Sequence, residues 1–175
     1  PYLLKDMEIT APNQVWCTDI TYIRLGSGFV YLTAVMDWHT RYVLSWEIST
    51  TMETYFCISA VQSAIRRHGK PEVFNTDQGS QYTSHEFTGM LESQYIQISM
   101  DVKGRWADNI MIERLWRSVK YEEIYTKEYA SVGELIAALR TYFLFYNNER
   151  RHSGLEQKTP AEAYGNQQNK LAIAA

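Results

Sequence analysis

The stretch VWCTDITYIRLGSGFVYLTAVMD, residues 15–37, decides the fold. Residues 15–25 are rich in β-branched and aromatic types and alternate roughly between polar and apolar, which predicts a strand. Gly26-Ser27-Gly28 is a turn signal, and the nearly continuous apolar run at residues 29–37 predicts a second, buried strand. A third strand, YVLSWEIS at residues 42–49, is predicted after a short polar corner. Two short connections in succession indicate an antiparallel meander.

The pattern then changes to helical spacing. Residues 53–68 repeat apolar side chains at that spacing, and Gly69 followed by Pro71 ends this helix. Helices and strands alternate along the rest of the chain. The expected elements are a strand at 72–76, a helix from about 84 to 93 opened by a capping box of Thr83 and Glu86, a strand at 95–100, a helix from about 107 to 124, a helix at 131–146 opened by Ser131 and Glu134, and a last helix opened by Thr159-Pro160-Ala161-Glu162.

This order of elements predicts an α/β fold. Three antiparallel strands followed by alternating helices and strands give a five-stranded mixed sheet with helices on both faces. The order is similar to that of ribonuclease-H-like domains. We divide the chain into a catalytic core with an N-terminal lead-in at 1–126, a C-terminal helical extension of the same domain at 127–165, and a flexible or helical tail at 166–175.

Composition places limits on the class of protein. The chain has 175 residues, of which 45% are hydrophobic, enough for one domain with a full core. It has no apolar run long enough for a membrane span, and charges at Lys5, Asp6 and Glu8 argue against a signal peptide. Two cysteines exclude a disulfide scaffold and a Cys-based zinc module, and they favour a reducing compartment, the cytoplasm.

The net charge of −3 argues, taken alone, against a nucleic-acid-binding protein, because phosphate binding favours a basic surface. Carboxylates that hold metal ions are the exception, since their negative charge is neutralised in use. Two bound divalent cations add four positive charges and would turn the balance positive.

Three carboxylates stand out by position. Asp19 lies in the middle of the first predicted strand, in an otherwise apolar or hydroxyl-bearing segment, and Asp77 directly follows the fourth strand, where ligands gather in open α/β sheets. Glu113 lies on the helix after the fifth strand, with 35 residues between it and Asp77. At about 100° per residue, Glu113 falls beside the apolar face of that helix, which is made of Ile112, Leu115, Trp116 and Val119.

These three carboxylates suit metal-dependent cleavage of a phosphodiester. Two Mg²⁺ ions activate the attacking oxygen and stabilise the leaving oxygen, and hard cations prefer oxygen ligands. We expect Asp19 to bridge both ions and Asp77 and Glu113 to hold one each; Mn²⁺ would suit the same ligands. Taken singly, each residue also has an ordinary interpretation. Asp19 could be a paired or edge aspartate, Asp77 could belong to a turn, and Glu113 could be a solvated surface residue. It is their joint order along the chain that favours a catalytic site.

Six short motifs carry a resemblance to a known family. They are WCTDITYI, NTDQGSQYTS, DNIMIERLW, KYE, YNNERRHSGL and TPAE. Over about residues 1–165 the chain closely resembles the catalytic domain of bacterial insertion-sequence transposases of the retroviral-integrase type. The resemblance implies a DDE transposase, a polynucleotidyl transferase with endonuclease activity that nicks element ends and joins their 3′-hydroxyls to target DNA. It assigns the metal-ligand roles to Asp19, Asp77 and Glu113.

The same resemblance implies partners. Double-stranded DNA, as element ends and as target, is the expected substrate, and joining two ends calls for a homo-multimer on DNA, with no membrane involved. Such transposases carry an upstream helix-turn-helix region that recognises the element ends; we expect it to precede the residues of this chain. The expected location is the bacterial cytoplasm, at the nucleoid.

Several polar and basic residues are candidates for DNA contact. Some lie after the fourth strand, some precede or share the helix of Glu113, and some form the densest basic run of the chain. They are Ser80, Gln81, Lys103, Arg105, Asn109, Arg117, Lys120, Arg150 and Arg151. Ser80 and Gln81 could instead belong to a plain loop. The basic run at Arg150 could instead be a solvated surface or a contact with a partner subunit.

Two other functions remain open from the sequence. The first is a ribonuclease-H-like nuclease that hydrolyses without joining, against which the extension after Ile124 argues. The second is an inactive DNA-binding or inhibitory subunit, against which the intact carboxylates and the acidic balance argue.

Overall fold

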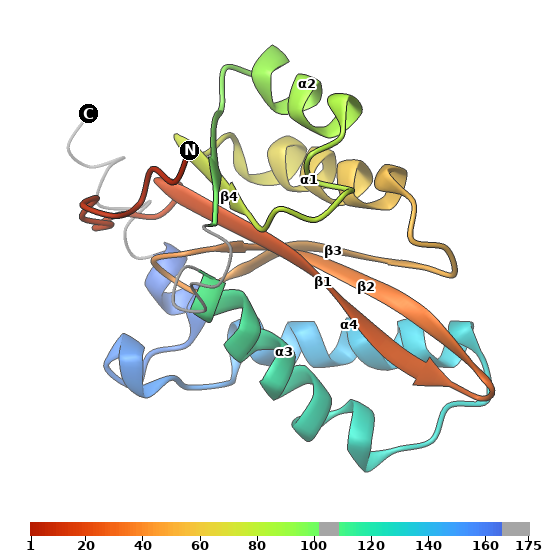
Figure 1. Ribbon diagram of the computed structural model, residues 1–175. Coiled ribbons are helices and arrows are strands. Elements are labelled where there is room, and N and C mark those ends of the chain that lie inside the picture. Colours follow the sequence, from red (N-terminus) through yellow and green to blue (C-terminus); the bar gives the residue numbers. More distant parts are fainter. Residues whose placement is uncertain (102–108, 166–175) are drawn as a thin grey trace.

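The computed structural model describes residues 1–101 and 109–165 (Figure 1). Its centre is a five-stranded sheet of order β3-β2-β1-β4-β5, so that β1 is the middle strand. The strands β1 to β3 are antiparallel, whereas β4 and β5 run parallel to β1. The strands are β1 (Val15–Leu25), β2 (Gly28–Asp37), β3 (Val43–Ser49), β4 (Val73–Thr76) and β5 (Gln97–Met100). The predicted mixed sheet is confirmed.

The hairpin of β1 and β2 follows the prediction closely. Gly26 has a φ of 59°, a left-handed conformation that glycine adopts without a steric penalty. The register pairs Leu25 with Gly28 and places Asp19 opposite Ala34. Because successive side chains of a strand point to opposite faces, Trp16 and Cys17 enter different core clusters, one on each side of the sheet.

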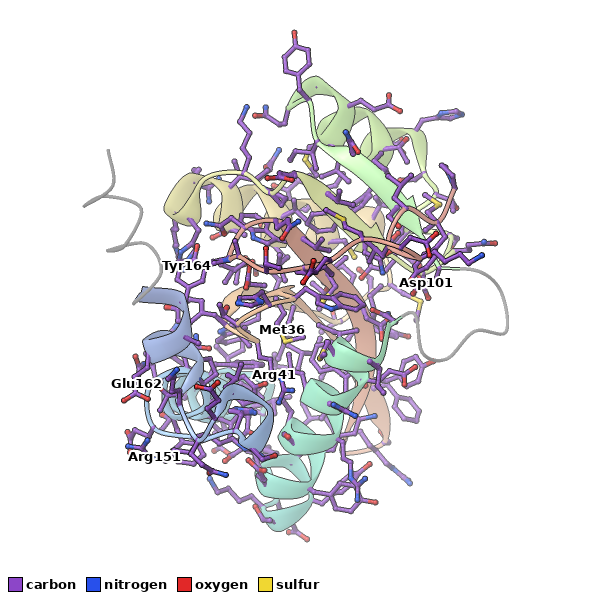
Figure 2. The ribbon with its side chains drawn as sticks, turned by 90° about the vertical axis from the view of Figure 1, so that its left-hand side faces the viewer. Met36, Arg41, Asp101, Arg151, Glu162 and Tyr164 are labelled. Atoms are coloured by element: carbon purple, nitrogen blue, oxygen red, sulfur yellow. The ribbon has the colours of Figure 1, made fainter. Side chains whose placement is uncertain are left out.

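Helices cover both faces of the sheet (Figure 1). The helices α1 (Thr54–His68) and α2 (His85–Ser93) pack on the face that Trp16 shares with Phe74. On the opposite face lie α3 (Ile110–Glu122) and α4 (Val132–Asn148), around a core that contains Met36, which Figure 2 shows near the middle of the molecule. No helix of the described ranges is both long enough and apolar enough to span a membrane.

Capping boxes set the starts of the later helices. The Ser131 hydroxyl accepts a hydrogen bond from the Glu134 amide at 3.2 Å, as predicted. The box at Thr159 is reciprocal: its amide donates to Glu162 Oε2 at 2.8 Å, while its hydroxyl accepts from the Glu162 amide at 3.2 Å. The prediction that Thr83 caps α2 is wrong by one residue, because the neighbouring Ser84 makes the cap.

Two other predicted boundaries shift. The fifth strand begins at Gln97 and not at residue 95, because Tyr95 has a φ of 59°, which is incompatible with a strand. The helix predicted from 107 to 124 is α3, described from Ile110 to Glu122, and a short 3-10 turn, η2 (Ile124–Thr126), follows it. The predicted start of that helix at 107 and the predicted tail at 166–175 lie outside the described residues.

The segment after α4 is tied to the rest of the molecule by hydrogen bonds. The buried side chain of Asn147 makes two hydrogen bonds to the backbone of Val43. Its Oδ1 accepts from the Val43 amide and its Nδ2 donates to the Val43 carbonyl, both at 2.9 Å. A 3-10 turn, η3 (Ser153–Leu155), follows, and residues 160–165 are helical. Tyr164 then donates to Asn13 Oδ1 at 2.9 Å. The division of the chain at residue 127 stays a prediction.

Candidate active site

Asp19 occupies the middle of β1 on the face covered by α3. It shares this face with the buried Cys17 and Ile23, which alternate along the strand. The indole Nε1 of Trp116, on α3, donates a hydrogen bond to Asp19 Oδ2 at 3.0 Å. Because this bond links residues 97 positions apart, it fixes both the carboxylate and the position of α3 over β1.

Asp77 lies beside Asp19 because of the parallel register of β1 and β4. Cys17 on β1 pairs with Asn75 on β4. Asp19 comes two residues after Cys17, and Asp77 comes two residues after Asn75, in the same direction. The carboxylate of Asp77 is oriented by its own loop, since its Oδ1 accepts a hydrogen bond from the Gly79 amide at 2.8 Å. A Cβ at residue 79 would lie 2.9 Å from that same oxygen, so any side chain at this position would displace the Asp77 carboxylate or shift the loop.

Glu113 stands in the first turn of α3. The predicted apolar face of the helix is confirmed, because Ile112, Leu115, Trp116 and Val119 are all buried. Glu113 itself is exposed and lies beside that face. Since Trp116 on the same helix reaches Asp19, Glu113 lies on the same side of the sheet as Asp19.

The three carboxylates act on one another electrostatically. Burial, together with the negative charges of Asp77 and Glu113, raises the pKa of Asp19 to about 6, against the lowering effect of the Ile20 amide and the Trp116 indole. Cys17 beside it is fully buried, and burial raises the pKa of its thiol well above the usual value. The thiol is therefore a core group and not a nucleophile.

The donor chemistry of these residues fits a hard divalent cation. Carboxylate oxygens are its preferred ligands, and a cation would relieve the repulsion that raises the pKa of Asp19. Within residues 1–101 and 109–165, however, no three His, Cys, Asp or Glu side chains are gathered closely enough to hold an ion. The carboxylates therefore fit a divalent cation in ligand type and in charge, and Asp19 and Glu113 lie on the same side of the sheet.

The other candidate residues lie in the loop after β4, along α3, and in the segment after α4. Ser80 is exposed and donates to Gln81 Oε1 at 3.3 Å, and Gln81 donates to the Met52 carbonyl at 3.0 Å. Asn109, which caps α3, is buried, and its Oδ1 has no hydrogen-bond partner among the described residues. Lys103 and Arg105 lie outside the described residues.

The basic residues differ in how free they are. Arg117 is exposed and lies over the ring of Tyr121, 5.9 Å from its centroid, while Lys120 is half-buried on the same helix. Arg150 is held by Glu122, with Nη2 to Oε1 at 2.6 Å and Nε to Oε2 at 2.9 Å. Arg151 is exposed and donates to the Gln157 carbonyl at 2.8 Å. The predicted DNA contacts of these residues stay predictions.

Trp116 is a site residue that the sequence did not single out. From the sequence it is only one member of the apolar face of its helix. Its indole N–H is the available signal, because a tryptophan on a buried face needs an acceptor for that group. A carboxylate on the strand beneath is such an acceptor, and Asp19 supplies it.

Comparison with known proteins identifies the family. The family described as "Integrase core domain" matches residues 9–105, and a second family of the same description matches residues 94–160. The transposase for insertion sequence element IS904 of Lactococcus lactis is 35% identical over 93% of this chain and 66% of its own length. Transposase InsF for insertion sequence IS3A of Escherichia coli is 34% identical over 86% of this chain and 54% of its own length.

Solved structures share the fold. A chain of the simian T-cell lymphotropic virus intasome, in complex with PP2A regulatory subunit B56 gamma, matches with a TM-score of 0.76 and 22% identity over 88% of this chain and 55% of that one. The HTLV-2 integrase catalytic core domain in complex with magnesium matches with a TM-score of 0.66 and 22% identity over 88% of this chain and 97% of that one. The fold is therefore that of integrase catalytic cores, the ribonuclease-H-like fold that the sequence predicted.

The chain spans roughly half to two thirds of the length of these curated relatives, with 66% for the first and 54% for the second. The first family match alone covers more than half of the chain. The chain belongs to the integrase core domain family, alongside transposases of bacterial insertion sequences.

Proposed function

We propose that this chain is the catalytic core of a DDE transposase, which cleaves the ends of a DNA element and joins the freed 3′-hydroxyls to target DNA. The observation that carries the proposal is Asp19, held over the middle of the sheet by Trp116 and sharing an electrostatic field with Asp77 and Glu113. The transposases among the relatives and the magnesium named with the HTLV-2 integrase core support the same reaction class.

The residues of the chain prepare this reaction in distinct ways. The Trp116 indole keeps Asp19 Oδ2 oriented, and the Gly79 amide keeps Asp77 Oδ1 oriented, so that two of the three carboxylates are held before substrate arrives. When bound, two divalent cations, Mg²⁺ or Mn²⁺, supply activation of the attacking oxygen and stabilise the leaving oxygen. Asp19, Asp77 and Glu113 are the residues that would hold these ions, with Asp19 as a ligand of both.

Double-stranded DNA lies across the same face in this proposal. Ser80 and Gln81 flank Asp77, while Asn109, Arg117 and Lys120 follow the helix of Glu113. Joining two element ends requires more than one copy of the chain on DNA; an intasome and a dimeric integrase core among the solved neighbours are consistent with that. With bacterial transposases as relatives, the reaction in this proposal takes place in the cytoplasm, at the nucleoid.

A joining assay tests this function against a nuclease and against an inactive subunit. The chain is incubated with Mg²⁺ or Mn²⁺, a pre-nicked element end carrying a labelled 3′-hydroxyl, and a supercoiled plasmid. We expect labelled plasmid as the product. Shortened strands without joined product would favour a hydrolytic nuclease, and no change in either DNA would favour a binding subunit; either result contradicts the proposal.

Replacing Gly79 tests the placement of Asp77. The Cβ of Gly79→Ala would lie 2.9 Å from Asp77 Oδ1, so the carboxylate must move. We expect joining to fall by about a hundredfold, the usual cost of misplacing a reacting group by an ångström. The matched control is Gly89→Ala in α2, where a Cβ meets nothing within 4 Å and the free energy of unfolding should rise by roughly 0.5–1 kcal/mol. Equal joining by both variants would contradict the assigned role.

A further inference from the structure

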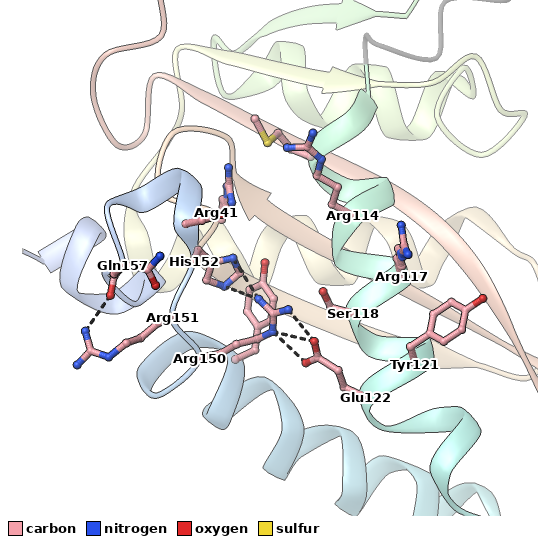
Figure 3. A pocket seen from close by; sticks show the side chains of 13 residues that line it. Arg41, Arg114, Arg117, Ser118, Tyr121, Glu122, Arg150, Arg151, His152 and Gln157 are labelled. Carbon is pink, nitrogen blue, oxygen red and sulfur yellow. Dashed lines mark hydrogen bonds and ion pairs between the residues drawn. The ribbon is translucent and has the colours of Figure 1, made fainter.

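A cavity lies beside α3, next to the face of the helix that carries Glu113. It has a volume of about 720 Å³ and is bounded by α3, by the segment after α4, and by the corner between β2 and β3 (Figure 3). At about 100° per residue, Arg114 and Ser118 point roughly 100–140° away from Glu113 around the helix axis. Five of the lining residues are arginines: Arg41, Arg114, Arg117, Arg150 and Arg151.

The positive charge of this cavity is only partly compensated. Glu122 is the carboxylate in its lining, and it is already engaged by Arg150 and by the Tyr142 hydroxyl, which donates to Oε2 at 2.8 Å. Figure 3 shows Arg150 between Glu122 and His152. The pair with Glu122 neutralises Arg150 and fixes it in place, and Arg151 lies 3.9 Å from Glu162, outside the lining. Arg41, Arg114 and Arg117 have no ion-pair partner among the described residues.

Arg41 is the most constrained of the remaining arginines. It sits at the corner between β2 and β3 with a φ of 60°, and its guanidinium lies against the backbone of Gly154, where a Cβ would come within 2.9 Å of Arg41 Cζ. Burial lowers the pKa of Arg41, and so do the charges of Arg114 and Arg150. The guanidiniums of Arg41 and Arg114 have no hydrogen-bond or ion-pair partner among the described residues. Two guanidiniums beside a cavity with no counter-charge among the described residues can both donate to an anionic group that enters it.

We propose that this cavity binds backbone phosphate of duplex DNA through Arg41 and Arg114, with Arg150 held in place by Glu122. Guanidinium groups suit phosphate because their planar fork donates two parallel hydrogen bonds to its oxygens. The inference rests on the proposed function and extends it to arginines that lie beside the carboxylates. The 13 residues of α3 span about 20 Å, or roughly six base-pair steps. One duplex along this helix can therefore reach both the carboxylates and the cavity.

Salt-dependent DNA binding tests the pocket apart from catalysis. Fluorescence anisotropy of a labelled 20-base-pair duplex is measured in EDTA over a range of KCl concentrations for the whole chain. Each phosphate contact contributes about −0.9 to the slope of log affinity against log salt. We expect Arg41→Gln and Arg114→Gln each to reduce the steepness of that slope by about one unit, and the double variant by about two. The matched control is Arg66→Gln, an exposed arginine of α1 on the opposite face of the sheet, which should leave the slope unchanged.

Three results would overturn the proposal: a wild-type chain that does not bind duplex, a double variant with the wild-type slope and affinity, or saturable binding of inorganic phosphate that the double variant loses while its DNA slope stays the same. Thermal unfolding of the double variant identifies any loss that comes from misfolding, and in that case the single variants carry the test. The joining assay is independent. A wild-type chain that joins strands alongside a double variant with an unaltered slope would leave the catalytic proposal standing and remove only this pocket.

Discussion

Asp19→Asn, Asp77→Asn and Glu113→Gln should each reduce strand joining by about a hundredfold to a thousandfold or more. Each substitution keeps the shape of the side chain and removes one negative oxygen, so the affected residue becomes a poor ligand for a divalent cation. Groups that stabilise developing charge in a dry site are each worth this much. The measurement is the rate of joined product with a pre-nicked element end, at saturating Mg²⁺ and again at saturating Mn²⁺.

The control for this series is Glu86→Gln, the same change on an exposed glutamate in the first turn of α2. It should join at the wild-type rate. The three site variants should bind duplex DNA in EDTA at least as tightly as the wild type, because each removes a negative charge and none removes a cation. If one of the three variants joins strands at the wild-type rate, the carboxylate that it replaces is not a ligand. The other two assignments are then judged by their own variants.

Asp19→Asn should also stabilise the protein at pH 8 in the absence of divalent ions. The native carboxyl has a pKa of about 6, above its usual value of 3.8, because it is buried and repelled by Asp77 and Glu113. Ionising it in the native state is therefore unfavourable relative to the unfolded chain. A difference of about two pKa units corresponds to at most about 3 kcal/mol in the free energy of unfolding. The asparagine avoids this cost and retains an oxygen that can accept from Trp116.

The pH dependence gives this prediction its sign. For a raised native pKa, the contribution of Asp19 to stability is fully present below about pH 4 and is lost as the pH rises through about 6. The gap between Asp19→Asn and the wild type should accordingly be widest at pH 8 and close towards pH 4. Urea unfolding at both pH values measures it, with Asp6→Asn, an exposed aspartate, as the control. A variant less stable than the wild type at pH 8 would contradict the cost assigned to this charge.

Divalent cations should reverse the order of the two proteins. Ions that bind only the native state raise its unfolding midpoint in proportion to their affinity. Adding Mg²⁺ or Mn²⁺ at pH 8 should therefore stabilise the wild type and leave Asp19→Asn almost unaffected. The same series with Glu86→Gln should follow the wild type. The stability lost at Asp19 in the ion-free protein is thus the counterpart of its affinity for a cation.

Local patterns along the chain were sufficient to predict the sheet and the position of Asp19. The β-branched and aromatic residues at 15–25, with their rough alternation, predicted the first strand to within a residue. An aspartate in the middle of such a strand must have a partner, and this signal is visible without any structure. The apolar face of α3 followed in the same way from a period of 3.6.

Contacts between distant segments could not be predicted in this way. The bond from Trp116 to Asp19 joins residues 97 positions apart, and the pair of Arg150 with Glu122 joins residues 28 apart. From the sequence Arg150 is one more cation in a basic run, because nothing local places Glu122 beside it. The unpaired state of Arg41 is equally invisible, since it depends on which carboxylates the fold brings near.

The position of Asp19 and Glu113 in their elements gives the site two very different mechanical parts. The amides of the central strand become accessible to hydrogen exchange only when the whole sheet comes apart, whereas the first turn of a helix opens by fraying, without help from the rest of the fold. We therefore expect Asp19 to keep its position during local openings of the first turn of α3, which displace Glu113.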